Sequence, residues 1–300
     1  MIERQSTVFR FAPSPNGELH LGHALSAMIG HDWSVRVGGR FLVRIEDIDQ
    51  TRSRDHFIQS ILEDLAWLGL DWERPELRQS EHFAEYAASA ARLQNMGVVY
   101  PCFATRGEIA VAIASAAKAG APQRLDPDGA PIYPGLYRGM SDQAVAARRD
   151  AGEPGALRLD MDKALAVVAR KLGGRPLTFR EIAQDGTERI VPADPARWGD
   201  SILIRKDTPA SYHLSVVVDD ARQGITHVTR GQDLYAATDL HRLLQVLLDL
   251  PEPRYHHHRL LLGSDGLKLA KSTGAPRLKD LRAQGVTPSE IRLRLGLAGF

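Results

Sequence analysis

The chain has 300 residues, 43% of them hydrophobic and 25% charged, which suits a globular protein with a sizeable core and roughly two domains. The formal net charge of +1 excludes a strong overall basic field for nucleic acid, and the single cysteine, Cys102, excludes both a disulfide framework and a zinc site of several thiolates. No apolar run reaches the ~18 residues of a membrane span and the N-terminus lacks a secretory signal pattern, so we expect a cytoplasmic enzyme with no membrane partner.

The first third of the chain alternates between strand and helix patterns. Short apolar runs at 7–12 and 40–45 predict buried strands, and the second run ends in a cluster of acidic residues. Apolar residues at helical spacing predict helices over 21–37, 53–68 and 81–96. This alternation is typical of an α/β protein with a parallel sheet.

The composition changes in the middle of the chain. Residues 99–194 are rich in Ala, Gly, Pro and Arg, and their Ala-rich helix patterns alternate with helix breakers, so we interpret them as an inserted domain. Strand patterns resume at 201–205, 214–218 and 226–229, and a helix is expected over 236–250.

The stretch FAPSPNGELHLGHAL contains two histidines at the junction between a predicted strand and the helix that follows it. Amides at a helix N-terminus bind phosphate, and His20 and His23 can face the same side of the first turn. Gly22 removes a side chain between them, so a flat ligand can approach the backbone. The pattern predicts a nucleoside triphosphate site, although neither a G-x-G-x-x-G motif nor a P-loop is present. The alternative is two partly exposed histidines at a helix start.

A second patch, GLKLAKS, brings Lys268 and Lys271 together on a loop that begins with glycine. These lysines are either a solvated surface or mobile cations that close over a triphosphate and stabilise the departing pyrophosphate. The segment from Gly266 onward holds seven Lys or Arg and two acidic residues, so we expect it to attract a polyanion such as tRNA.

Together, these motifs resemble the class I aminoacyl-tRNA synthetases. HLGH is similar to the HIGH motif and KLAKS to KMSKS, while the flanking RIEDID, ASYHLSVVVDD and THVTRGQDLYAAT resemble the glutamyl branch. Because the chain ends 28 residues after Ser272, it resembles the short glutamyl-Q tRNA(Asp) synthetases, which lack an anticodon-binding domain.

This resemblance implies an α/β fold with a Rossmann-like catalytic domain over 1–98 and 195–253. An inserted α+β domain would occupy 99–194, and the KMSKS-like loop and a short helical segment 254–300. The implied reaction is the activation of L-glutamate by ATP with Mg²⁺, followed by transfer to queuosine at the wobble position in the anticodon loop of tRNA-Asp. We expect a monomer.

The resemblance also implies roles for individual residues. The glutamate-binding set is Arg10, Ser14, Glu46, Tyr212 and Arg230. The ATP-binding set is His20, Gly22, His23, Lys268 and Lys271. The catalytic set is His20, His23 and Lys271. Glutamate carries two carboxylates and one ammonium, so two arginines and one acid suit it chemically, and glutamine is disfavoured without being excluded. Which arginine holds which carboxylate stays open.

Two departures from the family pattern stand out. Members often carry zinc in the inserted region, bound by C-x-C and Y-x-x-x-C, but the matching positions here are Cys102, Ala104, Tyr133 and Tyr137. One thiolate and one matching phenol do not make a tetrahedral site, so we predict that zinc is absent and that Cys102 is a buried, inert thiol. In addition, Ala270 replaces the serine of KMSKS.

Three consecutive histidines, 256–258, could suggest a metal site. Neighbouring side chains of an extended segment point to opposite faces, so we favour a structural role for them. Asp47 and Asp49 could also suggest a metal pair, but no third ligand is evident. Two other functions remain open: a shortened synthetase that charges the 3′ end of tRNA-Glu, and a non-catalytic nucleotide-binding module.

Overall fold

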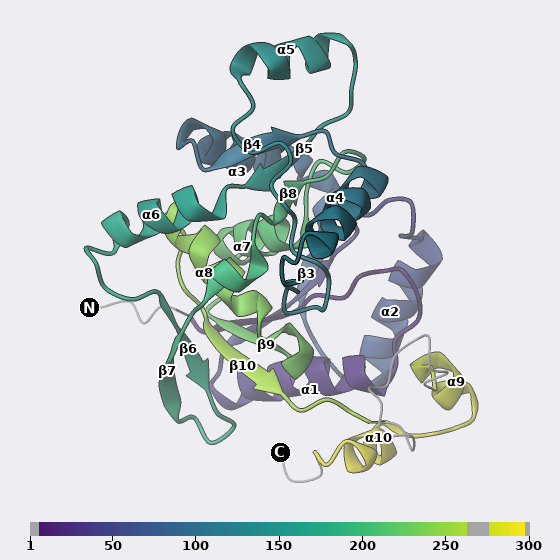
Figure 1. Ribbon diagram of the computed structural model, residues 1–300. Helices are drawn as coiled ribbons and strands as arrows, with labels where there is room; N and C mark the ends of the chain where they lie inside the picture. The colour runs from purple at the N-terminus through teal and green to yellow at the C-terminus, as the bar shows by residue number, and fades with distance from the viewer. Residues whose placement is uncertain (1–5, 263–275, 298–300) are drawn as a thin grey trace.

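The computed structural model describes residues 6–262 and 276–297. Its centre is a seven-stranded sheet with the strand order β3-β2-β1-β9-β10-β6-β7 (Figure 1). The strands are β1 Val8–Phe11, β2 Arg40–Ile45, β3 Glu73–Arg78, β6 Thr178–Ile182, β7 Glu188–Pro192, β9 His227–Gly231 and β10 Arg254–His258. All neighbours pair in parallel except β6 and β7, which form an antiparallel hairpin at one edge. The predicted α/β class with a mostly parallel sheet is confirmed.

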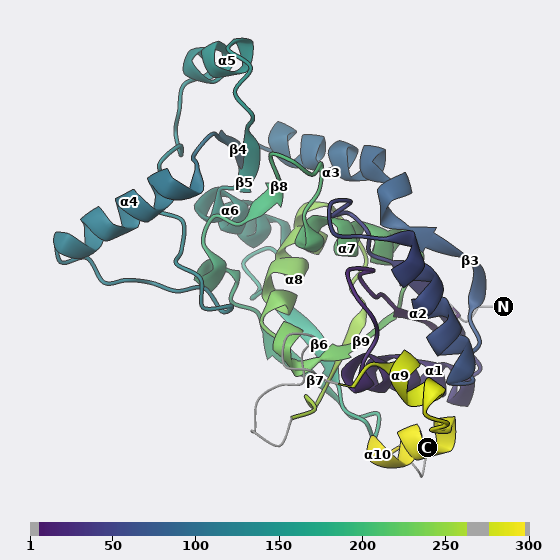
Figure 2. The ribbon, with the colours of Figure 1, turned by 90° about the vertical axis from the view of Figure 1, so that its right-hand side faces the viewer.

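Two apolar clusters hold helices against this sheet. One packs α1 (Leu21–Arg36) and α2 (Asp55–Trp67) against β1 and β2, and it includes residues of the C-terminal helices α9 (Leu278–Ala283) and α10 (Pro288–Arg294). The other joins the helices α3 Phe83–Asn95, α6 Met161–Lys171, α7 Tyr212–Arg222 and α8 Ala237–Leu247. The C-terminal helices therefore lie beside α1 and α2 at the lower edge of the molecule (Figures 1 and 2).

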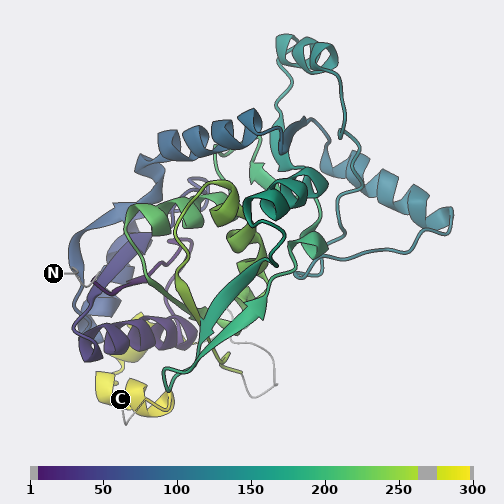
Figure 3. The ribbon, with the colours of Figure 1, turned by 90° about the vertical axis from the view of Figure 1, so that its left-hand side faces the viewer.

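A smaller antiparallel sheet lies beyond the second cluster. Its strand order is β4-β5-β8, with β4 at Val99–Cys102, β5 at Ala156–Leu159 and β8 at Ile202–Ile204. Two helices, α4 (Arg106–Lys118) and α5 (Asp142–Asp150), project from this part of the molecule, away from the large sheet (Figures 2 and 3). The observed α4 and α5 agree with the Ala-rich helices that the composition predicts in the inserted region.

The strand predicted at 214–218 is wrong, because these residues lie in α7. The run LSVVV is apolar apart from Ser215, so its periodicity does not distinguish a buried strand from a buried helix. Leu214, Val216 and Val217 are all buried in the cluster that α7 shares with α3 and α8. Tertiary burial therefore overrides the strand preference of the three valines.

Several strands from one expected domain belong to the sheet of another. β10 belongs to the large sheet, although the expected division assigns 254–258 to the C-terminal segment. β6 and β7 extend the large sheet from within 99–194, and β8 joins the small sheet from within 195–253. The three-part division stays a prediction, and strand membership supports moving its last boundary beyond 258. No helix in the described ranges is both long and apolar enough to cross a membrane.

Candidate active site

A cavity of about 750 Å³ opens at the carboxyl ends of β1, β2, β9 and β10. Residues just beyond those strand ends line it, as is usual for ligand sites in parallel sheets. Eight of the residues singled out in the sequence line this cavity together: Arg10, Ser14, His20, Gly22, His23, Glu46, Tyr212 and Arg230. The remaining two, Lys268 and Lys271, lie outside the described residues, as does Ala270.

The His-x-Gly-His turn is organised by its own backbone. His20 is the N-cap of α1, and its Nδ1 accepts a hydrogen bond of 3.1 Å from the amide of Gly22. His23 Nδ1 accepts from the His20 amide at 3.1 Å, and the two rings lie 3.9 Å apart between centroids. Because each Nδ1 accepts, each neutral ring carries its proton on Nε2, where it can donate to an oxygen.

Gly22 is required by the position of His20. A Cβ added at Gly22 would lie 2.9 Å from Cε1 of the His20 ring, closer than such contacts normally allow. The turn therefore combines helix N-terminal amides with two imidazole donors, and both favour bound phosphate.

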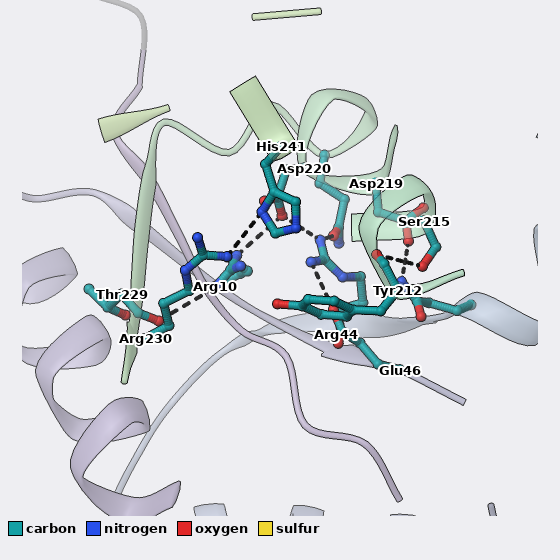
Figure 4. Close-up of polar contacts among 12 residues, drawn as sticks. Arg10, Arg44, Glu46, Tyr212, Ser215, Asp219, Asp220, Thr229, Arg230 and His241 are labelled. Atoms are coloured by element: carbon teal, nitrogen blue, oxygen red, sulfur yellow. Dashed lines mark hydrogen bonds and ion pairs between the residues drawn. The ribbon is translucent and has the colours of Figure 1, made fainter. Parts of the chain in front are cut away.

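Beside this turn, Arg10, Arg44, Asp220 and Glu46 form a buried charge network (Figure 4). Asp220 Oδ1 accepts from Arg10 Nε at 3.2 Å and from Arg44 NH1 at 2.8 Å. Arg44 also donates from NH2 to Glu46 Oε1 at 3.2 Å. Two arginines and two carboxylates thus hold one another at the ends of β1 and β2.

The two carboxylates of this network differ in protonation behaviour. Burial raises the pKa of Asp220, but the nearby Arg10 and Arg44 outweigh it, so the pKa is lowered from 3.8. Burial dominates at Glu46 and raises its pKa, although Arg44 and Arg10 oppose the shift. An incoming ammonium would stabilise the charged form of Glu46, which lines the cavity and suits that role.

Arg230 lies in the same cavity but has different partners. Its three donor nitrogens contact His257 Nε2 at 3.1 Å, His241 Nδ1 at 3.1 Å and Thr238 Oγ1 at 2.7 Å. Figure 4 shows His241 beside Arg230 on the side of the network away from Glu46. Among the ion pairs of residues 6–262 and 276–297, none joins Arg230 to a carboxylate.

Tyr212, at the start of α7, lies between two cavities. A second cavity of about 850 Å³ lies between the large and small sheets and shares Ser14, Asn16, Glu46 and Tyr212 with the first. Burial raises the pKa of Tyr212, with Arg230 opposing the shift, so the phenol stays protonated as a hydrogen-bond donor. The two cavities are therefore adjacent at Tyr212 and Glu46.

The four positions that match the family's zinc ligands come together in one cluster. Cys102, Ala104 and Tyr133 are buried there, and Tyr137 packs against them. The Cys102 thiol donates to Tyr133 Oη at 3.3 Å, and the Tyr137 amide donates to the same oxygen at 3.1 Å. The cluster contains one thiol, one methyl group and two phenols, a donor set that does not suit tetrahedral zinc.

The three consecutive histidines have separate partners. His256 contacts the Ile182 carbonyl at 2.8 Å, His257 contacts Glu181 and Arg230, and His258 contacts the Arg259 carbonyl at 2.9 Å. No group of three or more metal-ligating side chains occurs within the described ranges.

The basic residues of the C-terminal segment are largely paired with acids. Lys279 pairs with Glu18, Arg282 with Glu63 and Asp64, and Arg292 with Asp32 through bonds of 2.7 and 2.8 Å. These pairs attach α9 and α10 to the body of the protein. The charge that the sequence suggested for binding a polyanion is thus partly used within the fold.

Sequence reasoning missed several residues around the site, namely Arg44, Glu181, Asp220, Thr238 and His241. Arg44 and Asp220 lie in the motifs RIEDID and SVVVDD, and their burial as charged residues next to a candidate site would have been the signal to follow. Glu181 had no local signal, because β6 is far from the motifs in sequence.

The comparisons with known proteins agree with this geometry. The family described as tRNA synthetases class I (E and Q), catalytic domain, matches residues 6–300. A glutamyl-Q tRNA(Asp) synthetase of Rhodobacter capsulatus is 45% identical over 97% of this chain and 100% of its own length. One from Symbiobacterium thermophilum is 40% identical over 94% of this chain and 83% of its own.

A solved structure is also similar. The glutamate tRNA ligase of Elizabethkingia meningosepticum, solved in complex with its amino acid, has a TM-score of 0.71 and 26% identity. The match covers 90% of this chain and 53% of that longer ligase. The chain therefore belongs to the glutamate and glutamine group of class I tRNA synthetases, in the family of glutamyl-Q tRNA(Asp) synthetases, and is a ligase of the aminoacyl-tRNA synthetase type.

Proposed function

We propose that this enzyme activates L-glutamate with ATP and transfers the glutamyl group to queuosine at the wobble position of tRNA-Asp. The names of the relatives support the reaction, and one observation of the site supports the substrate. Arg10, Arg230 and Glu46 line a single cavity beside the His-x-Gly-His turn. Two guanidinium groups and one carboxylate match the two carboxylates and one ammonium of glutamate.

In the first step, an oxygen of the glutamate α-carboxylate attacks the α-phosphorus of ATP in line. The bond from that phosphorus to the bridging oxygen breaks, pyrophosphate leaves and glutamyl-adenylate forms. His20 and His23 donate from Nε2 to phosphate oxygens that gain charge, and Lys268 and Lys271 assist. Mg²⁺ accompanies ATP and neutralises part of the phosphate charge.

In the second step, a hydroxyl oxygen of the acceptor attacks the adenylate carbonyl and an ester bond forms. AMP leaves with the electron pair of the broken bond, and its phosphate takes up the hydroxyl proton. We propose that the acceptor enters through the second cavity, because it adjoins the first at Tyr212 and Glu46. The cluster of Cys102, Ala104, Tyr133 and Tyr137 borders this route, since Cys102 and Tyr133 also line the second cavity. We propose that no zinc is bound there.

Glutamate-dependent exchange of labelled pyrophosphate into ATP tests the first step. We expect exchange with glutamate and much less with glutamine or aspartate. The variant His20→Ala removes an imidazole donor and should reduce exchange by about 10²-fold or more. Full exchange by this variant would contradict the mechanism. We further propose a monomer in the cytoplasm, where its tRNA substrate is found, and sedimentation at micromolar concentration tests the oligomeric state.

A further inference from the structure

Arg230 is buried, yet the three groups that hold its donor nitrogens are neutral. Its Nε, NH1 and NH2 donate to His257, His241 and Thr238 at 2.7 to 3.1 Å. The ring of Tyr255 covers one face of the guanidinium, at 5.2 Å from its centroid. These contacts fix the plane and rotation of the group. A guanidinium has five N–H groups, so two are left for a carboxylate in the cavity.

Arg10 provides the contrast within the same site. Arg10 Nε forms an ion pair with Asp220 Oδ1 at 3.2 Å, and the same oxygen also pairs with Arg44. Arg230 has no such carboxylate among the ion pairs of the described residues. A buried charge without a counterion is costly, and the cost falls when an anion binds. Arg230 is therefore the arginine with the greater unmatched charge available to a substrate carboxylate.

This arrangement requires one particular tautomer of His257. Arginine can only donate, so His257 Nε2 must offer its lone pair to Arg230. The ring proton then lies on Nδ1, which is 2.8 Å from Glu181 Oε2. The other carboxylate oxygen of Glu181 accepts from the His257 amide at 3.1 Å. Both oxygens of Glu181 are thus acceptors, and a carboxylate supplies that pair of acceptors.

His241 follows the same logic on the other side of Arg230. Its Nδ1 accepts from Arg230, so its proton lies on Nε2, 3.2 Å from His213 Nδ1. Burial lowers the pKa of His257 to about 4 and lowers that of His241 well below 6.5, so both rings are neutral at neutral pH. His213 in turn lines the second cavity. The hydrogen bonds run outward from Arg230 in two branches, one ending at Glu181 on β6 and the other at His213 in the second cavity.

We propose that Glu181, His257 and His241 are positioning residues, which orient Arg230 through neutral acceptor atoms and keep its charge available for a carboxylate of glutamate. Glu181 acts through His257, because it selects the tautomer that Arg230 requires. This inference rests on the proposed function, in which Arg230 binds glutamate.

The variant Glu181→Gln tests the tautomer directly. The amide oxygen of Gln at position 181 accepts the hydrogen bond from the His257 backbone N–H. The NH₂ group of that side chain then faces His257 Nδ1 and donates to it. The His257 ring must then carry its proton on Nε2, so that two N–H donors, His257 Nε2–H and Arg230 Nε–H, face each other and their hydrogen bond is lost. In pyrophosphate exchange we expect KM for glutamate to rise about 10- to 100-fold, with KM for ATP within about twofold of the wild-type value.

Three further variants distinguish this role from a merely structural one. His257→Gln keeps an acceptor oxygen near the position of the wild-type Nε2, so Arg230 still has a neutral acceptor and KM for glutamate should be largely preserved. Adding Glu181→Gln to His257→Leu should cause no further rise in KM, because the tautomer no longer exists. The matched control His256→Gln alters the neighbouring histidine, which bonds the Ile182 carbonyl instead, and should leave KM unchanged.

The outcomes separate the two proposals. Wild-type KM for glutamate in a folded Glu181→Gln enzyme would overturn the positioning role, as would equal effects of that change with and without His257. If the wild-type protein shows no glutamate-dependent exchange, the proposed function fails instead. Thermal melting of each variant verifies that it is folded.

Discussion

The backbone N–H of Leu278 donates to the carbonyl of Leu19, at 2.8 Å, immediately before the His-x-Gly-His turn. Next to this bond, His20 and Arg277 form an isolated β-bridge, and Lys279 donates to Glu18 at 2.5 Å across 261 positions of sequence. The segment that follows the KMSKS-like loop is therefore attached directly to the His-x-Gly-His motif, the proposed ATP site.

This attachment predicts the effect of Lys279→Met. The variant removes the ion pair with Glu18, whose pKa burial raises but the hydrogen bonds from Lys279 and Ser60 lower overall. We expect KM for ATP to rise about 3- to 10-fold in pyrophosphate exchange, because an ion pair of this kind contributes on the order of 1 kcal/mol. Lys279→Arg keeps the charge and serves as the control. An unchanged KM in Lys279→Met would mean that this pair does not act on the ATP site.

The contact between Gly22 and His20 predicts that Gly22→Ala disables adenylate formation. The added methyl would displace the His20 ring, and misplacing a group by about 1 Å can cost roughly 10²-fold in rate. Gly107→Ala is a matched control, because Gly107 also occupies the second position of a helix and its nearest obstacle is 3.9 Å away. Pyrophosphate exchange and circular dichroism of both variants test this. Equal rates in the two variants would contradict it.

The burial of Asp64 predicts that the stability of the fold depends on pH at the junction of α2 and α9. Burial raises its pKa from 3.8 to about 6, although Arg282 opposes the shift. A carboxyl group whose pKa is raised in the folded state binds its proton more tightly there, so it destabilises the fold as pH rises from about 4 to above 6. The shift of roughly two pKa units corresponds to at most about 3 kcal/mol.

We therefore expect Asp64→Asn to raise Tm at pH 7.5 and to change it little at pH 4. Asp55→Asn, which makes the same change at an exposed carboxylate of the same helix that pairs with Arg78 and not with Arg282, is the control. Calorimetric melting at several pH values provides the measurement. A loss of stability at pH 7.5 in Asp64→Asn would show that the ion pair with Arg282 outweighs the cost of burial.

The cluster of Cys102, Ala104, Tyr133 and Tyr137 predicts that two substitutions create a zinc site. Ala104→Cys with Tyr137→Cys would give a C-x-C and Y-x-x-x-C pattern at four positions that already lie together. We expect about one zinc per chain in the double variant and essentially none in the wild type, as measured by plasma emission spectrometry after dialysis. Cys102→Ala added to the double variant should abolish the binding. Stoichiometric zinc in the wild type would contradict the account.

Much of the first half of the fold follows from the sequence because its signals are local. The strand 40–45 and the helix that begins at Leu21 agree with the structure, since a buried strand and a helix N-terminus each leave a pattern within a few residues. The residues of the His-x-Gly-His turn lie together for the same reason. The motifs around Glu46 and Arg230 assigned both residues to one site, and both line one cavity.

The rest depends on contacts between distant segments. Glu181 reaches His257 only because β6 pairs with β10, and no pattern around residue 181 indicates that pairing. The run at 214–218 is helical because its apolar residues are buried against α3 and α8. Likewise, counting charges in the C-terminal segment could not indicate that Arg292 is held by Asp32.

The most direct test is ATP-dependent transfer of labelled glutamate to two pools of total tRNA, one with queuosine and one without. The account predicts label only in the queuosine pool, released by mild base as expected for an ester. Equal labelling of both pools would contradict it and indicate charging of a tRNA 3′ end. Label in neither pool, with a folded protein, would instead favour a nucleotide-binding module without this activity.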